Sequence, residues 1–88
     1  MTRFGPANLG VYVCPHVFRA ERPVLLVSRA DGDWQFLCGG RHEYGETPHH
    51  IGVGHLVARD HTLEQVADLA VDGEAERLSI KHPWVRHA

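Results

Sequence analysis

The sequence predicts a small α+β domain in which an antiparallel sheet of about four to five strands packs against one main helix. Three observations lead to this prediction. Short β-branched and aromatic runs, bounded by glycine, proline and aspartate, recur along the first two thirds of the chain. Asp31-Gly32 separates two of these runs and predicts a hairpin, because glycine adopts positive φ at little cost. Near residue 60 the apolar spacing changes to that of a helix.

The first strand is expected over residues 9–18. Pro15 lies inside it and cannot donate a ladder hydrogen bond, so the strand is predicted to lie at an edge of the sheet or to contain a bulge. Residues 23–29 are almost continuously apolar, which is typical of a central strand. Residues 34–38 are expected to return antiparallel to that strand after the predicted turn.

A polar stretch rich in turn residues follows over residues 39–50 and predicts a long loop, a type of segment that often carries function. Residues 51–57 predict a fourth strand or a transition from strand to helix.

The main helix is expected to begin at His61 or Thr62, because Asp60 can cap its first turn. Residues 75–80 predict the last strand, and residues 83–85 a closing segment on the core. The apolar positions expected to form the core come from both the strands and the helix: Val13, Leu25, Val27, Trp34, Phe36, Leu63 and Val66.

Length and composition limit the class of protein. The chain suits one domain, residues 1–88, with residues 1–8 as a loose lead-in. Its 43% hydrophobic and 23% charged residues are a globular mixture. The net charge of −2 without a basic stripe argues against nucleic acid as a partner. No apolar run is long enough to predict a membrane span, the first residues do not follow the pattern that predicts a signal peptide, and two cysteines are too few for a secreted disulfide scaffold. We therefore expect a cytoplasmic protein without a membrane partner; its oligomeric state is not indicated.

Cysteines and histidines in the predicted strands suggest a metal site. Cys14 and His16 are two residues apart, so they would share one face of an extended strand. Cys38 and His55 end neighbouring apolar runs and complete a set of two thiolates and two imidazoles. These ligands suit zinc, which is the cofactor we expect, with His42 as a substitute ligand. With only three protein ligands, water would hold the fourth position and hydrolysis would become conceivable.

Two other interpretations of the same residues stay open. The thiols can act as small apolar core residues, with the histidines bonded to backbone groups. A Cys–His nucleophile pair would instead need an exposed pocket and a lowered cysteine pKa. The sequence indicates neither, so we expect no catalytic residues, without excluding an enzyme.

The long predicted loop is the candidate partner-binding surface. Tyr44, His49 and His50 lie in it, and aromatic and histidine side chains on a loop suit the binding of a protein partner. An ordinary exposed loop is the alternative.

Five short groups of residues, spread over roughly residues 11–86, together carry a resemblance to a known family. They are Pro23-Val24 with Ser28-Arg29, Asp33-Trp34-Gln35-Phe36-Leu37 with Gly39, Asp60 with Leu63 and Leu69, Gly73-Glu74-Ala75-Glu76-Arg77, and Trp84-Val85. Taken in this order, they resemble a bacterial domain family of unknown function that includes immunity proteins of polymorphic toxin systems. The resemblance implies a small α+β domain on an antiparallel sheet, with no catalytic residues to carry over.

The expected function is therefore that of a small non-catalytic binding domain, stabilised by a structural zinc ion held by cysteine and histidine. The resemblance implies an alternative, an immunity-type protein that binds and occludes a toxin. A small metal- or thiol-dependent enzyme is the second alternative.

Overall fold

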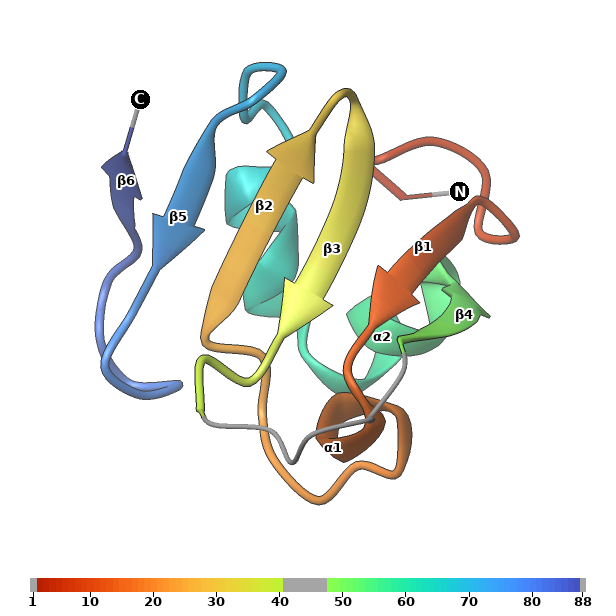
Figure 1. The fold of residues 1–88 in the computed structure, drawn as a ribbon, viewed down its shortest axis with the longest axis horizontal. Helices are drawn as coiled ribbons and strands as arrows, with labels where there is room; N and C mark the ends of the chain where they lie inside the picture. Colours follow the sequence, from red (N-terminus) through yellow and green to blue (C-terminus); the bar gives the residue numbers. More distant parts are fainter. Residues whose placement is uncertain (1, 41–47, 88) are drawn as a thin grey trace.

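The computed structural model describes residues 2–40 and 48–87. Six strands form one sheet with the spatial order β4-β1-β3-β2-β5-β6 (Figure 1). The strands are β1 (Gly10–Val13), β2 (Leu26–Ala30), β3 (Asp33–Leu37), β4 (His49–Gly52), β5 (Glu74–Glu76) and β6 (Val85–His87). The helices are α1 (Pro15–Phe18), α2 (Val53–Arg59) and the 3₁₀-helix η1 (His61–Val66).

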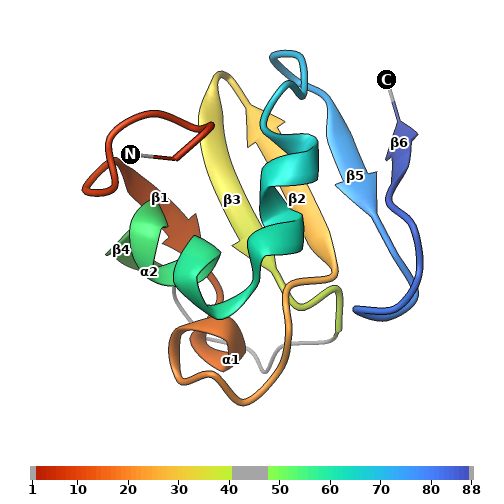
Figure 2. The ribbon, with the colours of Figure 1, turned by 180° about the vertical axis from the view of Figure 1, so that it is seen from behind.

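The helices are not spread evenly around the sheet. Figure 2 shows α2 and η1 lying against one face, while the face seen in Figure 1 carries no helix. Side chains of β1 alternate accordingly, because Val11 and Val13 are fully buried whereas Tyr12 is 41% exposed. We call the face without helices the open face of the sheet.

The predicted α+β class is confirmed, but the predicted sheet and helix differ from the observed ones. The sheet has six strands instead of four or five, and it is mixed because β1 and β3 run parallel. The expected main helix is replaced by short helices. Asp60 adopts an extended conformation, with φ −150° and ψ 97°, and so interrupts the helical region between α2 and η1. Its carboxylate accepts the Thr62 N–H and caps η1, as predicted, although the capped helix ends at Val66.

Pro15 ends the first strand early. β1 stops at Val13, and α1 begins at Pro15. Proline suits the first position of a helix because no N–H is needed there and its fixed φ is already helical. The prediction of one strand over residues 9–18, at an edge or with a bulge, is therefore wrong. β1 lies inside the sheet, between β4 and β3.

The predicted hairpin is confirmed. β2 and β3 are antiparallel, with Ala30 paired to Asp33 across a two-residue turn. Asp31 and Gly32 both have positive φ, at 53° and 86°, as a type I′ turn requires. This turn twists in the same sense as the strands that it joins.

Residues 51–57 follow the second of the two predicted alternatives for this region. β4 passes directly into α2 at Val53, so the segment is a transition from strand to helix. The predicted loop over residues 39–50 is shorter at its end, because β4 already begins at His49. Residues 41–47 of that loop lie outside the described residues.

The core lies between the sheet and the helices. Phe36 and Leu63 are its largest fully buried side chains, and all but one of the predicted core positions are buried. Leu25 is the exception, because it is only half-buried. Phe4, in the segment predicted as a lead-in, packs edge-to-face on Trp34 and Phe36 with ring centroids 4.9 Å and 5.4 Å away.

The end of the chain is less regular than predicted. The last strand expected over residues 75–80 is reduced to β5, and Trp84 and β6 form the closing segment. Trp84 packs against the core, and its indole N–H donates to the Thr62 carbonyl at 3.2 Å. None of the helices in the described ranges combines the length and apolar character needed to cross a bilayer.

Candidate metal centre

Parallel pairing of β1 and β3 brings the two cysteines to one end of the sheet. Val13 and Phe36 are paired in register, Cys14 follows Val13 directly, and Cys38 follows two residues after Phe36. Because both strands run in the same direction, their carboxyl ends meet at the same edge, where α1 also begins (Figure 1). His16 is the second residue of α1 and reaches this point from the helix.

The three side chains lie close enough together to bind a metal ion. The two Sγ atoms and one ring nitrogen of Cys14, Cys38 and His16 all lie within 4.8 Å of one another. Cys38 Sγ is 3.8 Å from His16 Nδ1. On tetrahedral zinc, bond lengths of about 2.3 Å to sulfur and about 2.0 Å to nitrogen place such atoms about 3.6–3.8 Å apart. A shift of about 1 Å at most would therefore seat all three on one ion.

The surroundings of Cys38 favour its thiolate, the form that binds metal. Burial raises the pKa of the Cys38 thiol, but hydrogen bonds from the Gly40 N–H, the Arg22 guanidinium and the Cys14 side chain outweigh this, so that the pKa lies below its usual value. The Gly40 N–H is 3.4 Å from Cys38 Sγ, and Arg22 Nη1 is 3.8 Å away. Donors of this kind commonly stabilise metal-bound thiolates from the second coordination shell.

Sequence reasoning overlooked these two supporting residues. A Cβ atom at Gly40 would lie only 2.8 Å from Arg22 Nη1, so the absence of a side chain there lets the guanidinium approach the sulfur. Gly39 has φ +73°, a conformation that favours glycine and turns the chain back toward Cys38. The Gly-Gly pair after Cys38 was the available signal, whereas nothing in the sequence pointed to Arg22.

Not all predicted ligands join this group. Cys14, His16 and Cys38 come together, although for a different reason from the one predicted, because Cys14 follows the end of β1 and His16 lies in α1, so the two do not share a strand. His55 lies on α2, is exposed and is outside the group. His42 lies outside the described residues.

The predicted partner-binding residues do not form one loop surface in the described structure. Tyr44 lies outside the described residues, while His49 and His50 are the first two residues of β4. Neighbouring strand residues point to opposite faces. The His49 ring stacks on Phe18 at 4.2 Å, whereas the His50 ring packs on Tyr12 at 5.0 Å.

The arrangement fits metal binding better than nucleophilic catalysis. Both cysteines are only 4% exposed, so a substrate would have little access to either sulfur. Three protein ligands would leave one position for a further ligand or water. Comparison of the chain with protein-family models, with curated proteins and with solved structures finds no match.

Proposed function

We propose that this chain is a small non-catalytic binding domain whose fold is stabilised by a zinc ion held by Cys14, His16 and Cys38. The observation that carries the proposal is the convergence of their three ligand atoms within 4.8 Å, from the residues that directly follow β1 and β3 and from α1. A metal here would tie together the ends of β1 and β3 and the start of α1. Structural zinc contributes directly to folding free energy, which suits a domain with a modest core.

The fourth ligand is predicted to be either a histidine or water. His42 is four residues after Cys38 in the sequence, which makes it the first candidate among the histidines. His55 would require a rearrangement of α2, since it is outside the group in the described structure.

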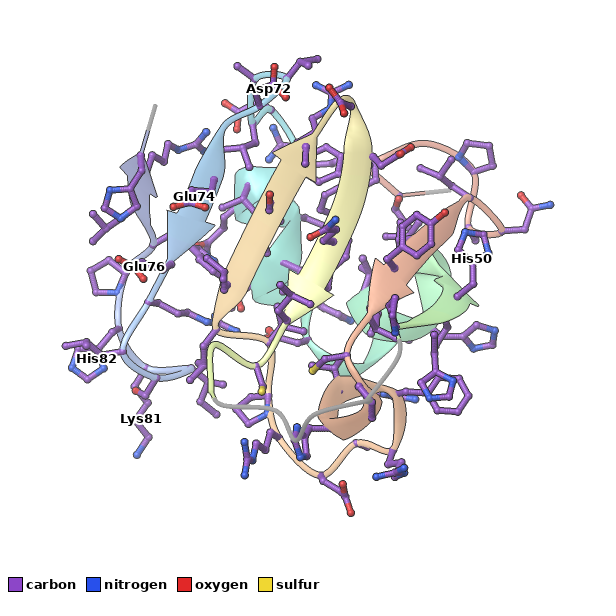
Figure 3. All side chains as sticks on the ribbon, in the orientation of Figure 1. His50, Asp72, Glu74, Glu76, Lys81 and His82 are labelled. Atoms are coloured by element: carbon purple, nitrogen blue, oxygen red, sulfur yellow. The ribbon has the colours of Figure 1, made fainter. Side chains whose placement is uncertain are left out.

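The surface proposed for a protein partner is centred on Tyr12 and His50 of the open face. The rings lie side by side on paired residues of β1 and β4, and the strand β4 forms one edge of the sheet (Figure 3). A row of paired positions continues from them across the open face through Gln35, Ser28 and Glu74. Exposed aromatic side chains beside polar ones are common at protein interfaces. That the partner is a toxin, as the family resemblance implies, stays a prediction.

The metal is tested by elemental analysis of protein purified without a His-tag and reconstituted with zinc. We expect about one zinc per chain, and a melting temperature that falls when a chelator removes it. Cobalt substitution should give a thiolate-to-metal charge-transfer band that is lost in Cys38→Ser. Substoichiometric zinc after reconstitution, with the same melting temperature in the presence of chelator, would contradict the proposal.

The ligand set is tested by matched histidine substitutions. His16→Ala should lose zinc, whereas His87→Ala, a change at an exposed residue of β6, should retain it. His42→Ala and His55→Ala then decide the fourth ligand, since only a ligand substitution should weaken zinc affinity. If both keep the affinity of the unchanged protein, water holds the fourth position.

The partner surface is tested in a pulldown followed by affinity measurement. Tyr12→Ala with His50→Ala should weaken partner binding, whereas Phe18→Ala with His49→Ala, which alters the aromatic pair outside the open face, should not. The reverse result would move the proposed surface to the α1 side of β4.

A further inference from the structure

A second feature lies beside the candidate metal centre. A groove of about 450 Å³ runs between α1, the segment that leads from α1 to β2, the end of α2 and the start of η1. This volume falls within the range of about 300–1,000 Å³ found for small-molecule sites. It would hold on the order of ten to fifteen non-hydrogen atoms, at about 30 Å³ each as in liquid water.

The floor of the groove is apolar and comes from the core itself. Val17, Val24, Leu56 and Leu63 line it, and each is at most 5% exposed. Ile80 contributes a more exposed apolar wall, at 55%. An occupant with an apolar body would therefore cover side chains that already form a continuous hydrophobic surface.

The acidic and basic side chains that line the groove differ in whether they form ion pairs. The two carboxylates in its lining each have a cationic partner: Asp60 pairs with Arg77 at 2.6 Å, and Glu21 with Arg19 at 3.6 Å. The two guanidinium groups in the lining donate to other kinds of acceptor. Arg59 donates to the neutral carbonyl of Val17 at 3.1 Å, and Arg22 donates to the Cys38 sulfur. Over residues 2–40 and 48–87, neither arginine forms an ion pair with a carboxylate.

We propose that this groove binds a small amphipathic anion, a carboxylate carried on an apolar chain, with the carboxylate at Arg59 and the chain over Val17 and Leu56. A guanidinium presents a planar fork of donors that matches a carboxylate, so each donor can be used in a charge-assisted bond. Arg59 lies on the last turn of α2 and can keep its bond to the Val17 carbonyl through one nitrogen while it offers the others.

This inference goes beyond the proposed function, and it does not depend on a metal. Arg59 donates to the Val17 carbonyl, whereas Arg22 lines the groove and also donates to Cys38 Sγ. Arg59 is therefore the residue to change in a test, because its substitution leaves the candidate metal centre intact.

The experiment follows backbone amide chemical shifts while octanoate is added to the full chain. We expect saturable shifts at residues that line the groove, and binding of octylammonium weaker by about tenfold or more, since only the sign of the head group differs. Arg59→Gln should weaken octanoate binding by about tenfold. Arg86→Gln, which removes an exposed guanidinium paired with Asp68 outside the groove lining, should leave it unchanged.

Arg59→Lys separates charge from geometry, because lysine keeps the charge but loses the fork. An intermediate affinity in this variant supports the proposed carboxylate contact. Shifts without saturation, equal affinity for octanoate and octylammonium, or unchanged affinity in a folded Arg59→Gln protein would each overturn the proposal.

Discussion

Substitution of Arg77 is the strongest test of which contacts stabilise this fold. Its side chain is only 1% exposed, and its guanidinium donates four hydrogen bonds. Two go to the Val24 carbonyl, one to the Thr62 hydroxyl and one to the Asp60 carboxylate. The guanidinium also lies 4.2 Å from the centre of the Trp84 ring. Arg77 thus connects the segment before β2, the start of η1 and the closing segment. Arg77→Met removes this connection while keeping an apolar side chain of similar length.

The cost of Arg77→Met can be worked from the partners that it leaves behind. The Val24 carbonyl belongs to a residue only 5% exposed, so losing both donors costs about 1–3 kcal/mol. The lost cation–π contact adds about 1–2 kcal/mol. Asp60 keeps its Thr62 donors and is 24% exposed, so water can replace part of its lost ion pair. Relief from burying a charge offsets some of the total. We therefore expect a net loss of about 3 kcal/mol, within the range for breaking a buried ion pair.

A loss of about 3 kcal/mol is large for a chain of this size. An 88-residue domain has a free energy of unfolding of about 4–13 kcal/mol. Each kcal/mol corresponds to about 4–8 °C, so the melting temperature should fall by about 12–24 °C in circular dichroism. Arg19→Met is the control, because the Arg19–Glu21 pair is exposed and should contribute only about 0–1 kcal/mol. A fall of less than about 4 °C for Arg77→Met would refute the reasoning.

The pH dependence of stability provides a second readout for the same network. Partial burial raises the pKa of Asp60, but hydrogen bonds from the Thr62 hydroxyl and the Arg77 guanidinium outweigh it and hold the pKa below its usual value. A carboxyl group with a lowered pKa in the folded state adds stability that is present above its unfolded pKa of about 3.9 and lost as the pH falls through the folded pKa. Stability should therefore drop below about pH 4, and this drop should be shallower in Arg77→Met than in the unchanged protein.

Two further predictions concern the packing of α2 and the reactivity of the two cysteines. A Cβ atom at Gly54 would lie 2.7 Å from the Ala7 Cβ and 2.9 Å from the Ala7 carbonyl oxygen. Although alanine favours a helix more than glycine does, Gly54→Ala should therefore lower the free energy of unfolding by about 1–3 kcal/mol, measured in urea. A gain in stability would show that the N-terminal segment moves aside easily. Zinc should slow alkylation of Cys14 and Cys38 in the folded protein, measured by mass spectrometry, and equal rates with and without zinc would argue against thiolate ligation.

Local chemistry decided several features that could be predicted from the sequence. The Asp31-Gly32 turn follows from the positive φ that these residues tolerate, and its register is fixed by the two-residue loop. Asp60 caps the following helix because its carboxylate reaches an N–H only two residues away. The passage from strand to helix at Val53 also matched one of the two alternatives predicted from the apolar pattern.

The tertiary structure decided the features that depend on contacts distant in the sequence. Whether Pro15 breaks a strand or starts a helix depends on where β1 stops, and the residue types over 9–18 favour a strand throughout. An assumed strand geometry predicted one group of Cys14, His16, Cys38 and His55, of which only the first three meet. The actual cause is the parallel pairing of β1 with β3, together with the turn into α1.

Residue type alone determined that this chain carries thiol and imidazole ligands suited to zinc, on a small α+β domain. Only the folded chain decided which of them meet, because ligand atoms from segments about twenty residues apart converge through sheet register and not through local spacing. The same holds for the two arginines that bond to distant parts of the chain. Arg22 is 16 residues from its partner Cys38 in the sequence, and Arg77 is 53 residues from its partner Val24. Local propensity acts over a few residues, whereas the energies of a buried charge and of a shared ligand site are set by whatever packs around them.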